Sequence, residues 1–143
     1  MHDLDDVVAL PGAVEVMSLL PEDRRGIATS ARRNLMEARL GAAGIPLPQM
    51  TVAVDDVTRG KPDPEPFLVA AERLGHDPSD VLVVEDSISG LTGAKAAGCA
   101  TLAVVTTTSA EKLAVSGLAD GVVKNLSEVA VTTSERGVQI GLR

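Results

Sequence analysis

Short apolar runs separated by longer helical patterns recur along the chain, and they predict alternating strands and helices. Apolar residues at helical spacing favour helices over residues 13–20, 31–43, 64–74 and 110–116. Wholly or mostly apolar short runs favour strands over residues 25–28, 50–54, 81–84, 101–105 and 122–123. A tail follows with weak alternation at Val138, Ile140 and Leu142. Because strands alternate with helices, we expect a parallel α/β sheet in a single domain spanning residues 1–143.

The apolar run at residues 81–84 is the strand around which the rest of the pattern is organised. A run of this kind, bounded by polar residues, is typical of a strand buried on both faces. Glu85 and Asp86 follow directly, so we expect them at the carboxyl end of the strand, where open α/β sheets bind ligands. The residues after them predict a helix cap and a close approach of the helix backbone to its neighbour: Ser87, Gly90 and Gly93.

Composition narrows the class of protein. The chain has 143 residues with 45% hydrophobic residues, which suits one globular domain, and it contains one Phe and no Trp or Tyr. A net charge of −7 argues against a nucleic-acid surface, which is normally basic. The single cysteine, Cys99, excludes an internal disulfide and is expected as a small buried residue. No apolar run is long enough to span a bilayer, so we expect no membrane partner and a cytoplasmic location.

Polar residues that could bind ligands or take part in catalysis follow three of the predicted strands. Thr29 and Ser30 follow the first strand, Lys61 lies in a loop after the second, and Glu85 and Asp86 follow the third. The carboxyl ends of parallel strands share one edge of a sheet, so these side chains can converge on one pocket. A hydroxyl with backbone N–H groups binds anions, a lysine neutralises phosphoryl charge, and paired carboxylates hold Mg²⁺. Together they predict a phosphate site with bound Mg²⁺.

Each of these residues also has a simpler structural explanation. Thr29 and Ser30 alone are more often a helix cap, Lys61 alone a solvated loop residue, and Glu85 with Asp86 a solvated acidic turn. Gly60 and Pro62 flank the lysine and restrict its placement. The occurrence of all three signals at successive strand ends favours the functional interpretation.

The chain resembles the haloacid dehalogenase superfamily, and within it the helical-cap branch of sugar- and polyol-phosphate phosphatases. Residues 27–30 (Ile-Ala-Thr-Ser) resemble the second motif of that family, whose Ser or Thr binds phosphate. Residues 60–64 (Gly-Lys-Pro-Asp-Pro) resemble the third motif, whose lysine steadies the phosphoryl charge. Residues 83–87 (Val-Val-Glu-Asp-Ser), with Gly90, resemble the fourth motif, whose second acid ligates Mg²⁺ while the first supports it.

The resemblance, which extends from about Val8 to Leu126, implies both a fold and an activity. The implied fold is a three-layer, Rossmann-like parallel sheet with flanking helices. The implied activity is hydrolysis of a small sugar- or polyol-phosphate, of the glycerol-phosphate type, through Mg²⁺ and an aspartyl-phosphate. Thr29 and Lys61 would take part in catalysis, Thr29, Ser30 and Lys61 would bind phosphate, and Asp86 with Glu85 would hold the metal.

The first motif of the family has no counterpart in the chain. That motif is an apolar strand ending in Asp-x-Asp-Gly-Thr, whose first Asp is the nucleophile and whose second is the general acid and base. Residues 3–6 (Asp-Leu-Asp-Asp) have the acidic spacing, but no apolar strand precedes them and no Gly-Thr follows. We interpret them as the end of a cap, and the chain as the carboxyl-terminal part of the family's core domain. We therefore expect metal and phosphate binding with little or no turnover.

A missing first-motif strand has a structural consequence. In the family that strand lies between the strand ending at Thr29 and the strand ending at Glu85, so its loss predicts two unpaired strand edges. Such edges favour self-association with another chain. The sequence leaves open whether the two strands close up, whether another segment fills the gap, or whether the chain is unstable alone.

A second class of function is a non-catalytic α/β module. It would be either a degenerate phosphatase that only binds its phosphorylated ligand and Mg²⁺, or a receiver-like signalling domain. Receiver domains also gather acids, a hydroxyl and a lysine around Mg²⁺, but their acids come early in the chain and their lysine last. Here the order is hydroxyl, lysine, acids, which favours the phosphatase family.

Overall fold

Over residues 13–123, helices and strands alternate as the hydrophobic pattern predicts. The structure is a computed structural model that describes residues 13–134 and 137–142, so the acidic residues 3–6 and the segment up to Gly12 lie outside the described residues. The helices are α1 (Ala13–Leu19), α2 (Arg33–Ala43), α3 (Glu65–Leu74), α4 (Ile88–Ala97) and α5 (Ala110–Val115). The strands are β1 (Gly26–Ala28), β2 (Met50–Val52), β3 (Leu82–Glu85), β4 (Ala100–Val104), β5 (Gly121–Val123), β6 (Val129–Ser134) and β7 (Gly137–Leu142).

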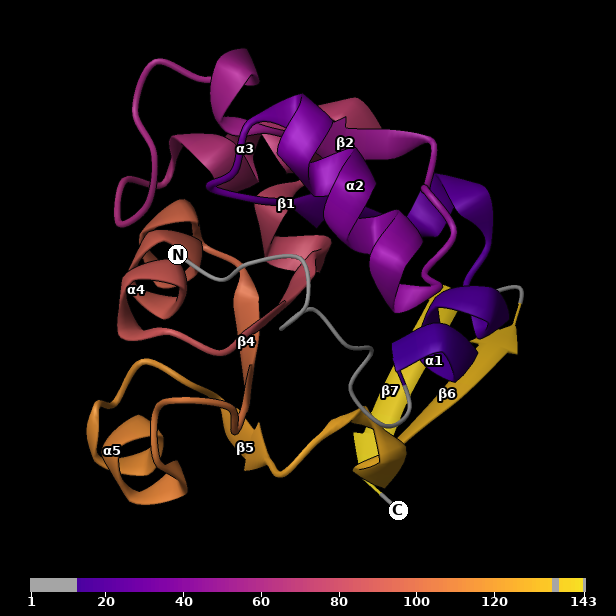
Figure 1. Cartoon of the computed structure of the whole chain (residues 1–143). Coiled ribbons are helices and arrows are strands. Elements are labelled where there is room, and N and C mark those ends of the chain that lie inside the picture. Colours follow the sequence, from indigo (N-terminus) through magenta and orange to yellow (C-terminus); the bar gives the residue numbers. More distant parts are fainter. Residues whose placement is uncertain (1–12, 135–136, 143) are drawn as a thin grey trace.

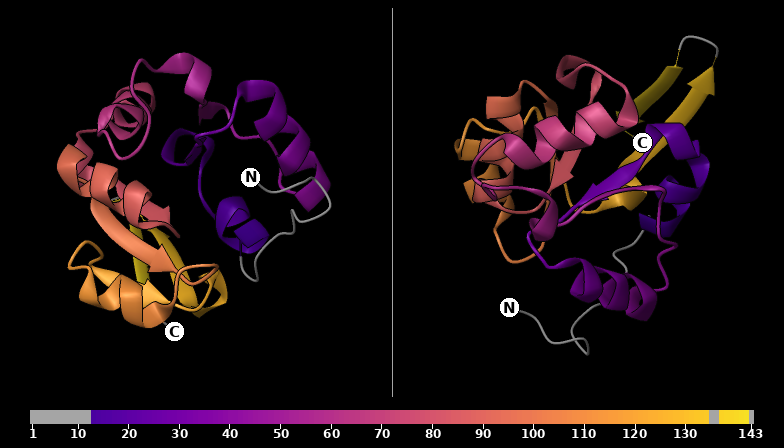
Figure 2. Two further views of the ribbon diagram at one scale, coloured as in Figure 1. Left: turned by 60° about the vertical axis from the view of Figure 1, so that its left-hand side comes forward. Right: turned by 90° about the horizontal axis from the view of Figure 1, so that it is seen from above.

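The strands form two parallel sheets and one antiparallel hairpin (Figure 1). In the first parallel sheet β1 pairs with β2, and Ala28 lies opposite Val52. In the second, β4 lies between β3 and β5, and Glu85 lies opposite Ala103. The hairpin joins β6 to β7 and packs beside α1, as Figure 2 shows from two further directions. Parallel sheets with flanking helices are the α/β fold that the sequence predicts.

A gap separates β1 from β3. Neither strand pairs with the other, and no strand among the described residues lies between them. The amide of Ala100 donates to the carbonyl of Val81 at 3.0 Å, so by alternation the backbone of Val83 also faces β4, whereas that of Val84 faces away. The two strands therefore do not close up, and within residues 13–134 and 137–142 neither strand has a partner on the edge that faces the other.

Helices α3 and α4 hold the two sheets together from one face. Helix α3 packs against β1, β2 and α4, and α4 packs against β3 and β4. Phe67 of α3 anchors a buried cluster to which β1 contributes Ala28 and β3 contributes Val83. At Gly93, a methyl group would lie 2.8 Å from the carbonyl oxygen of Asp63, so only glycine allows this approach.

The expectation that residues 81–84 are buried on both faces is wrong. Val84 is 40% exposed, and Leu82 and Val83 are only partly buried. A strand is buried on both faces when neighbours flank it and layers cover it. Among the described strands, β3 has a neighbour on one edge only, so it lacks the flanking strand that burial on both faces requires.

Two further details differ from the hydrophobic pattern. The strand expected over residues 50–54 ends at Val52, because Asp56 accepts a hydrogen bond from the amide of Ala53 at 2.9 Å and the backbone turns there. The weakly alternating tail is strand β7, which pairs with β6, a strand that the pattern did not predict. The apolar residues of β6 pass into Thr and Ser without a break, so the sequence does not mark its boundary.

Several other local predictions are confirmed. Ser87 caps α4 by accepting a hydrogen bond from the amide of Gly90 at 3.1 Å. Cys99 is buried beside Phe67, and burial raises the pKa of its thiol.

Helix length is a separate feature of the fold. Among the described residues, none of the helices is long and apolar enough to cross a membrane.

Candidate active site

Lys61 bridges the two parallel sheets at the carboxyl ends of β1 and β3. Its Nζ atom donates to the carbonyl oxygen of Ala28, the last residue of β1, at 3.4 Å. The same atom donates to Oε2 of Glu85, the last residue of β3, at 2.9 Å. The side chains of Lys61 and Glu85 are only 10% and 12% exposed, so the ion pair is largely shielded from water. Two of the three predicted strand-end signals therefore meet directly.

The loop that carries Lys61 is held at its base. Oε2 of Glu65 accepts hydrogen bonds from the amides of Thr58 and Arg59, at 2.5 Å and 3.0 Å. The Lys61 Nζ atom lies over the Phe67 ring, 5.3 Å from its centroid. At this distance the face of the ring attracts the ammonium group by a cation–π interaction. These contacts explain why a lysine in a polar loop reaches a buried partner rather than solvent.

Glu85 is fully engaged by neighbouring groups. Oε2 accepts from Lys61, and Oε1 accepts from the Ser87 hydroxyl and the Asp86 amide, both at 3.2 Å. A methyl group at Gly90 would lie 2.1 Å from the Glu85 carboxyl carbon, so α4 starts close against this side chain. Glu85 therefore supports the site and keeps Lys61 in place.

Asp86 presents a freer carboxylate. Its Oδ2 accepts a hydrogen bond from the Thr106 hydroxyl at 2.7 Å, and no other described side chain donates to it. Partial burial raises the pKa of Asp86, but hydrogen bonding, led by Thr106, and the charge of Lys61 outweigh burial, and the pKa lies below its ordinary value. The residue is therefore an anion at neutral pH.

The donor set around Asp86 fits Mg²⁺. No group of three or more His, Cys, Asp or Glu side chains gathers anywhere in the described residues, so a closed protein cage is absent from that part of the chain. Mg²⁺ commonly takes one or two carboxylates and completes its shell with water and phosphate oxygens. One oxygen of Asp86, with Glu85 beside it, meets that requirement.

Thr29 and Ser30 lie at the end of β1 but do not touch Lys61. The amide of Thr29 donates to Val52, and its Oγ1 accepts from the amide of Ala31 at 3.1 Å. Neither residue caps α2, because its N-cap position is Arg32. Because the Thr29 hydroxyl only accepts in its contact with the Ala31 amide, it can still donate a hydrogen bond to a ligand. Ser30 is exposed at the same edge.

Sequence reasoning missed two contributors to this edge of the sheet. Thr106 lies two residues after the end of β4, the strand next to β3, so the strand-end rule that identified the other residues also points to it. Phe67 carries no such signal, because its role depends on how α3 crosses the gap. The same rule would mislead at Asp56, whose carboxylate turns away to bind the guanidinium groups of Arg33 and Arg73.

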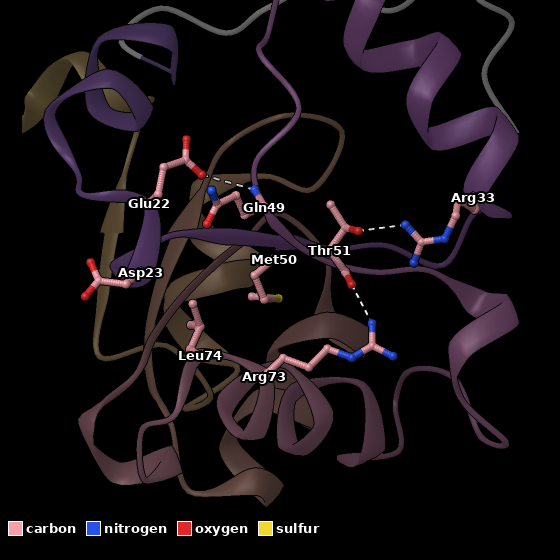
Figure 3. A pocket seen from close by; sticks show the side chains of 8 residues that line it. All are labelled: Glu22, Asp23, Arg33, Gln49, Met50, Thr51, Arg73 and Leu74. Carbon is pink, nitrogen blue, oxygen red and sulfur yellow. Dashed lines mark hydrogen bonds between the residues drawn. The ribbon is translucent and has the colours of Figure 1, made fainter.

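A pocket at the free edge of β2 contains none of the predicted site residues (Figure 3). Arg33 and Arg73 reach into it from two helices, and both donate to Thr51, at 2.7 Å to the hydroxyl and 2.6 Å to the carbonyl. Its other lining residues come from the amino-terminal side of the sheet: Glu22, Asp23, Gln49, Met50 and Leu74. The guanidinium groups are thus engaged in holding the edge strand.

Comparison with curated proteins finds relatives over most of the chain. Validoxylamine A 7'-phosphate phosphatase of Streptomyces hygroscopicus subsp. limoneus is 38% identical over 132 residues, which cover 90% of this chain and 61% of the relative. Hexitol phosphatase A of Escherichia coli strain K12 is 34% identical over 139 residues, covering 94% of this chain and 62% of the relative. The chain thus spans about 60% of the length of these relatives.

A family model and solved structures give the same picture. The model described as haloacid dehalogenase-like hydrolase matches residues 2–98. The crystal structure of CbbY from Rhodobacter sphaeroides in complex with phosphate superposes with a TM-score of 0.71 at 27% identity. The match covers 83% of this chain and 55% of that one.

Proposed function

The chain belongs to the haloacid dehalogenase-like hydrolase family, and we propose that it forms the phosphate- and Mg²⁺-binding part of a phosphatase for small sugar or polyol phosphates. The names of its relatives support this substrate class, since one acts on a hexitol phosphate and another on validoxylamine A 7'-phosphate. The partner would be a small phosphorylated metabolite. With residues 1–143 alone we expect binding and little or no turnover.

The observation that carries the proposal is the position of Lys61. A largely shielded ammonium group lies between the carboxyl ends of β1 and β3, where it already neutralises one carboxylate. A phosphoryl group arriving at this edge would meet a fixed positive charge in a poorly hydrated place, where electrostatic attraction is strong.

The other residues would share the work of holding the phosphoryl group. Thr29 would donate its hydroxyl proton to a phosphate oxygen, and the amide of Ser30 would add a second donor. Lys61 would offset the phosphate charge, and Asp86, supported by Glu85, would hold Mg²⁺. When bound, the ion supplies positive charge that bridges the carboxylate and the phosphate.

The expectation of little or no turnover rests on the sequence, in which no apolar strand ends in Asp-x-Asp-Gly-Thr, the motif that carries the nucleophile in the family. Glu85 is the one carboxylate that pairs with the lysine in the described part of the chain, and its oxygens are already engaged. A nucleophilic carboxylate needs an oxygen that is free to attack phosphorus. In a longer protein, the gap between β1 and β3 would admit the strand that carries it.

Calorimetric titration with inorganic phosphate tests the proposal on the 143-residue chain. In the presence of Mg²⁺ we expect phosphate to bind, and we expect Asp86→Asn or removal of Mg²⁺ with EDTA to weaken binding by about tenfold or more. Asp86→Asn keeps the shape of the side chain, so a loss reports on its charge. Equal phosphate affinity in the wild type and in Asp86→Asn would contradict the proposed site.

A second measurement separates binding from turnover. Phosphate release from a hexitol phosphate and from glycerol 1-phosphate should stay at the level of the blank. Release by the wild type that is lost in Asp86→Ala would show that the chain is a complete enzyme and would overturn the expectation of inactivity. Circular dichroism of each variant controls for folding.

A further inference from the structure

Thr106 is tied to the candidate site by a single directed contact. It follows β4 closely, and β4 is the strand that pairs with β3. From there its hydroxyl donates to Oδ2 of Asp86 at 2.7 Å, a short O–H···O⁻ geometry typical of a charge-assisted hydrogen bond. Thr106 is otherwise exposed, so its side chain contributes little to the core.

The contact makes the two oxygens of Asp86 unequal. Oδ2 is held by the hydroxyl, and none of the hydrogen bonds that the described side chains form reaches Oδ1. Glu85 differs, since both of its oxygens are engaged by Lys61, Ser87 and the Asp86 amide. Oδ1 of Asp86 is thus the carboxylate oxygen left for an incoming cation.

We propose that Thr106 is a positioning residue, which holds Asp86 through Oδ2 so that Oδ1 stays presented to a divalent cation. The inference rests on the proposed function, because it assumes that Asp86 binds Mg²⁺. An aspartate on a strand end has freedom about both side-chain torsions, and binding a metal ion costs less when that freedom is already restricted. Thr106 acts through Asp86 and need not touch the ligand.

Binding of Mg²⁺ itself, measured by calorimetry without phosphate or substrate, tests the role of Thr106. Thr106→Val keeps the branched shape and removes the donor, and we expect it to weaken Mg²⁺ binding by about tenfold to 100-fold, the range for groups that orient metal ligands. Thr106→Ser retains the hydroxyl and should bind Mg²⁺ nearly as the wild type does.

The next residue provides a matched control. Thr107 is also an exposed threonine in this turn, and no described group forms a hydrogen bond with its hydroxyl. Thr107→Val should therefore leave Mg²⁺ affinity unchanged. Thermal unfolding of all three variants should match the wild type, because none of these side chains is buried, so a change in affinity cannot be a loss of fold.

The outcomes separate this inference from the function on which it rests. Mg²⁺ binding by the wild type with equal affinity in Thr106→Val would overturn the role of Thr106 alone. A folded wild type that binds no Mg²⁺ would overturn the metal site and this inference together. Weakening in Thr106→Val with rescue by Thr106→Ser would support both.

Discussion

At the scale of single residues, the shielded ion pair of Lys61 and Glu85 lies between the two parallel sheets. In contrast to this pair, an exposed partner is present in each of the ion pairs Arg25–Glu22, Arg33–Asp56, Arg59–Asp63 and Arg73–Asp56. Shielded pairs lose solvation energy on folding, so they seldom add much net stability, although removing one partner is costly. Such a pair is better explained by function, since it keeps an ammonium group ready at a strand end.

Asp56 is the residue whose ionisation should matter for stability in acid. Its carboxylate accepts hydrogen bonds from the amide of Ala53 and from two guanidinium groups, those of Arg33 and Arg73. The Ala53 amide, aided by the guanidinium groups, holds the pKa of Asp56 below its usual range despite some desolvation. Its contribution to the free energy of unfolding is therefore present above the unfolded pKa of about 3.9 and is lost as pH falls through the lower folded pKa.

Asp56→Asn should reduce the free energy of unfolding by about 1 kcal/mol at neutral pH, because partly exposed charge pairs contribute little each. The difference from the wild type should shrink as the pH falls below about 4. Urea unfolding at pH 7 and pH 3 measures both values. Asp23→Asn is the control, since Asp23 is exposed and the described residues offer it no partner. A cost at Asp56 that does not shrink between pH 7 and pH 3 would contradict the ionic explanation.

At the scale of elements, the first turn of α4 and the end of β3 are fitted to each other. Gly90 leaves the space that the Glu85 side chain fills, and a methyl group there would lie 2.1 Å from its carboxyl carbon. Gly41 in α2 is also a helical glycine, but a methyl group at that position would meet no atom within 4 Å. The two glycines therefore differ in packing and not in helix propensity.

Gly90→Ala and Gly41→Ala should consequently have opposite effects. Gly41→Ala should raise the free energy of unfolding by about 0.5–1 kcal/mol, the usual gain of alanine over glycine in a helix. Gly90→Ala should lower it and weaken phosphate binding, because Glu85 must leave Lys61. Urea unfolding and phosphate titration measure the two effects. A similar gain in both variants would show that Glu85 moves aside at no cost.

The same elements show how far the sequence alone predicts the site. Strand ends are readable because an apolar run stops at Val84 and carboxylates follow, so the pattern places Glu85 and Asp86 correctly at one edge. The contact between Lys61 and Glu85 follows from that shared edge. The support from Phe67 is not predictable, because it depends on the packing of α3 across a gap. Strand β6 is also not predictable, for a different reason. Its apolar residues are followed by Thr and Ser, so the sequence shows no clear strand boundary.

At the scale of the whole molecule, the main feature is that β1 and β3 do not pair with each other. Helices α3 and α4 bridge the two parallel sheets from one face, and no described strand pairs with the edges of β1 and β3 that are directed at each other. We propose that the same edges allow self-association, because an unpaired strand readily accepts another chain.

Hydrogen exchange at β3 tests whether the gap is open. The amide of Val83 faces β4, whereas that of Val84 faces the gap, so Val84 should exchange at least about tenfold faster. Leu102 and Ala103 provide an internal control, because β4 is paired on both sides and the two amides should be similarly slow. Magnetic resonance resolves these amides individually.

Equal protection of Val83 and Val84 in dilute solution would contradict an open gap and would mean that another segment of the chain covers this edge. Protection of Val84 that increases with protein concentration would instead identify a second copy as the occupant. Either result would be specific to β3, since the β4 amides should not respond.

The position of Phe67 beneath Lys61 has a consequence for spectroscopy. Phe67 carries the sole phenyl ring of a chain that has no Trp or Tyr, and its centroid lies 5.3 Å from the lysine Nζ. The ring current of that one side chain should therefore shift the proton resonances of the Lys61 methylene groups, without overlapping contributions from other large aromatic rings. If the lysine moves when an anion binds, those resonances should move with it, so the protein contains its own unlabelled reporter of the site.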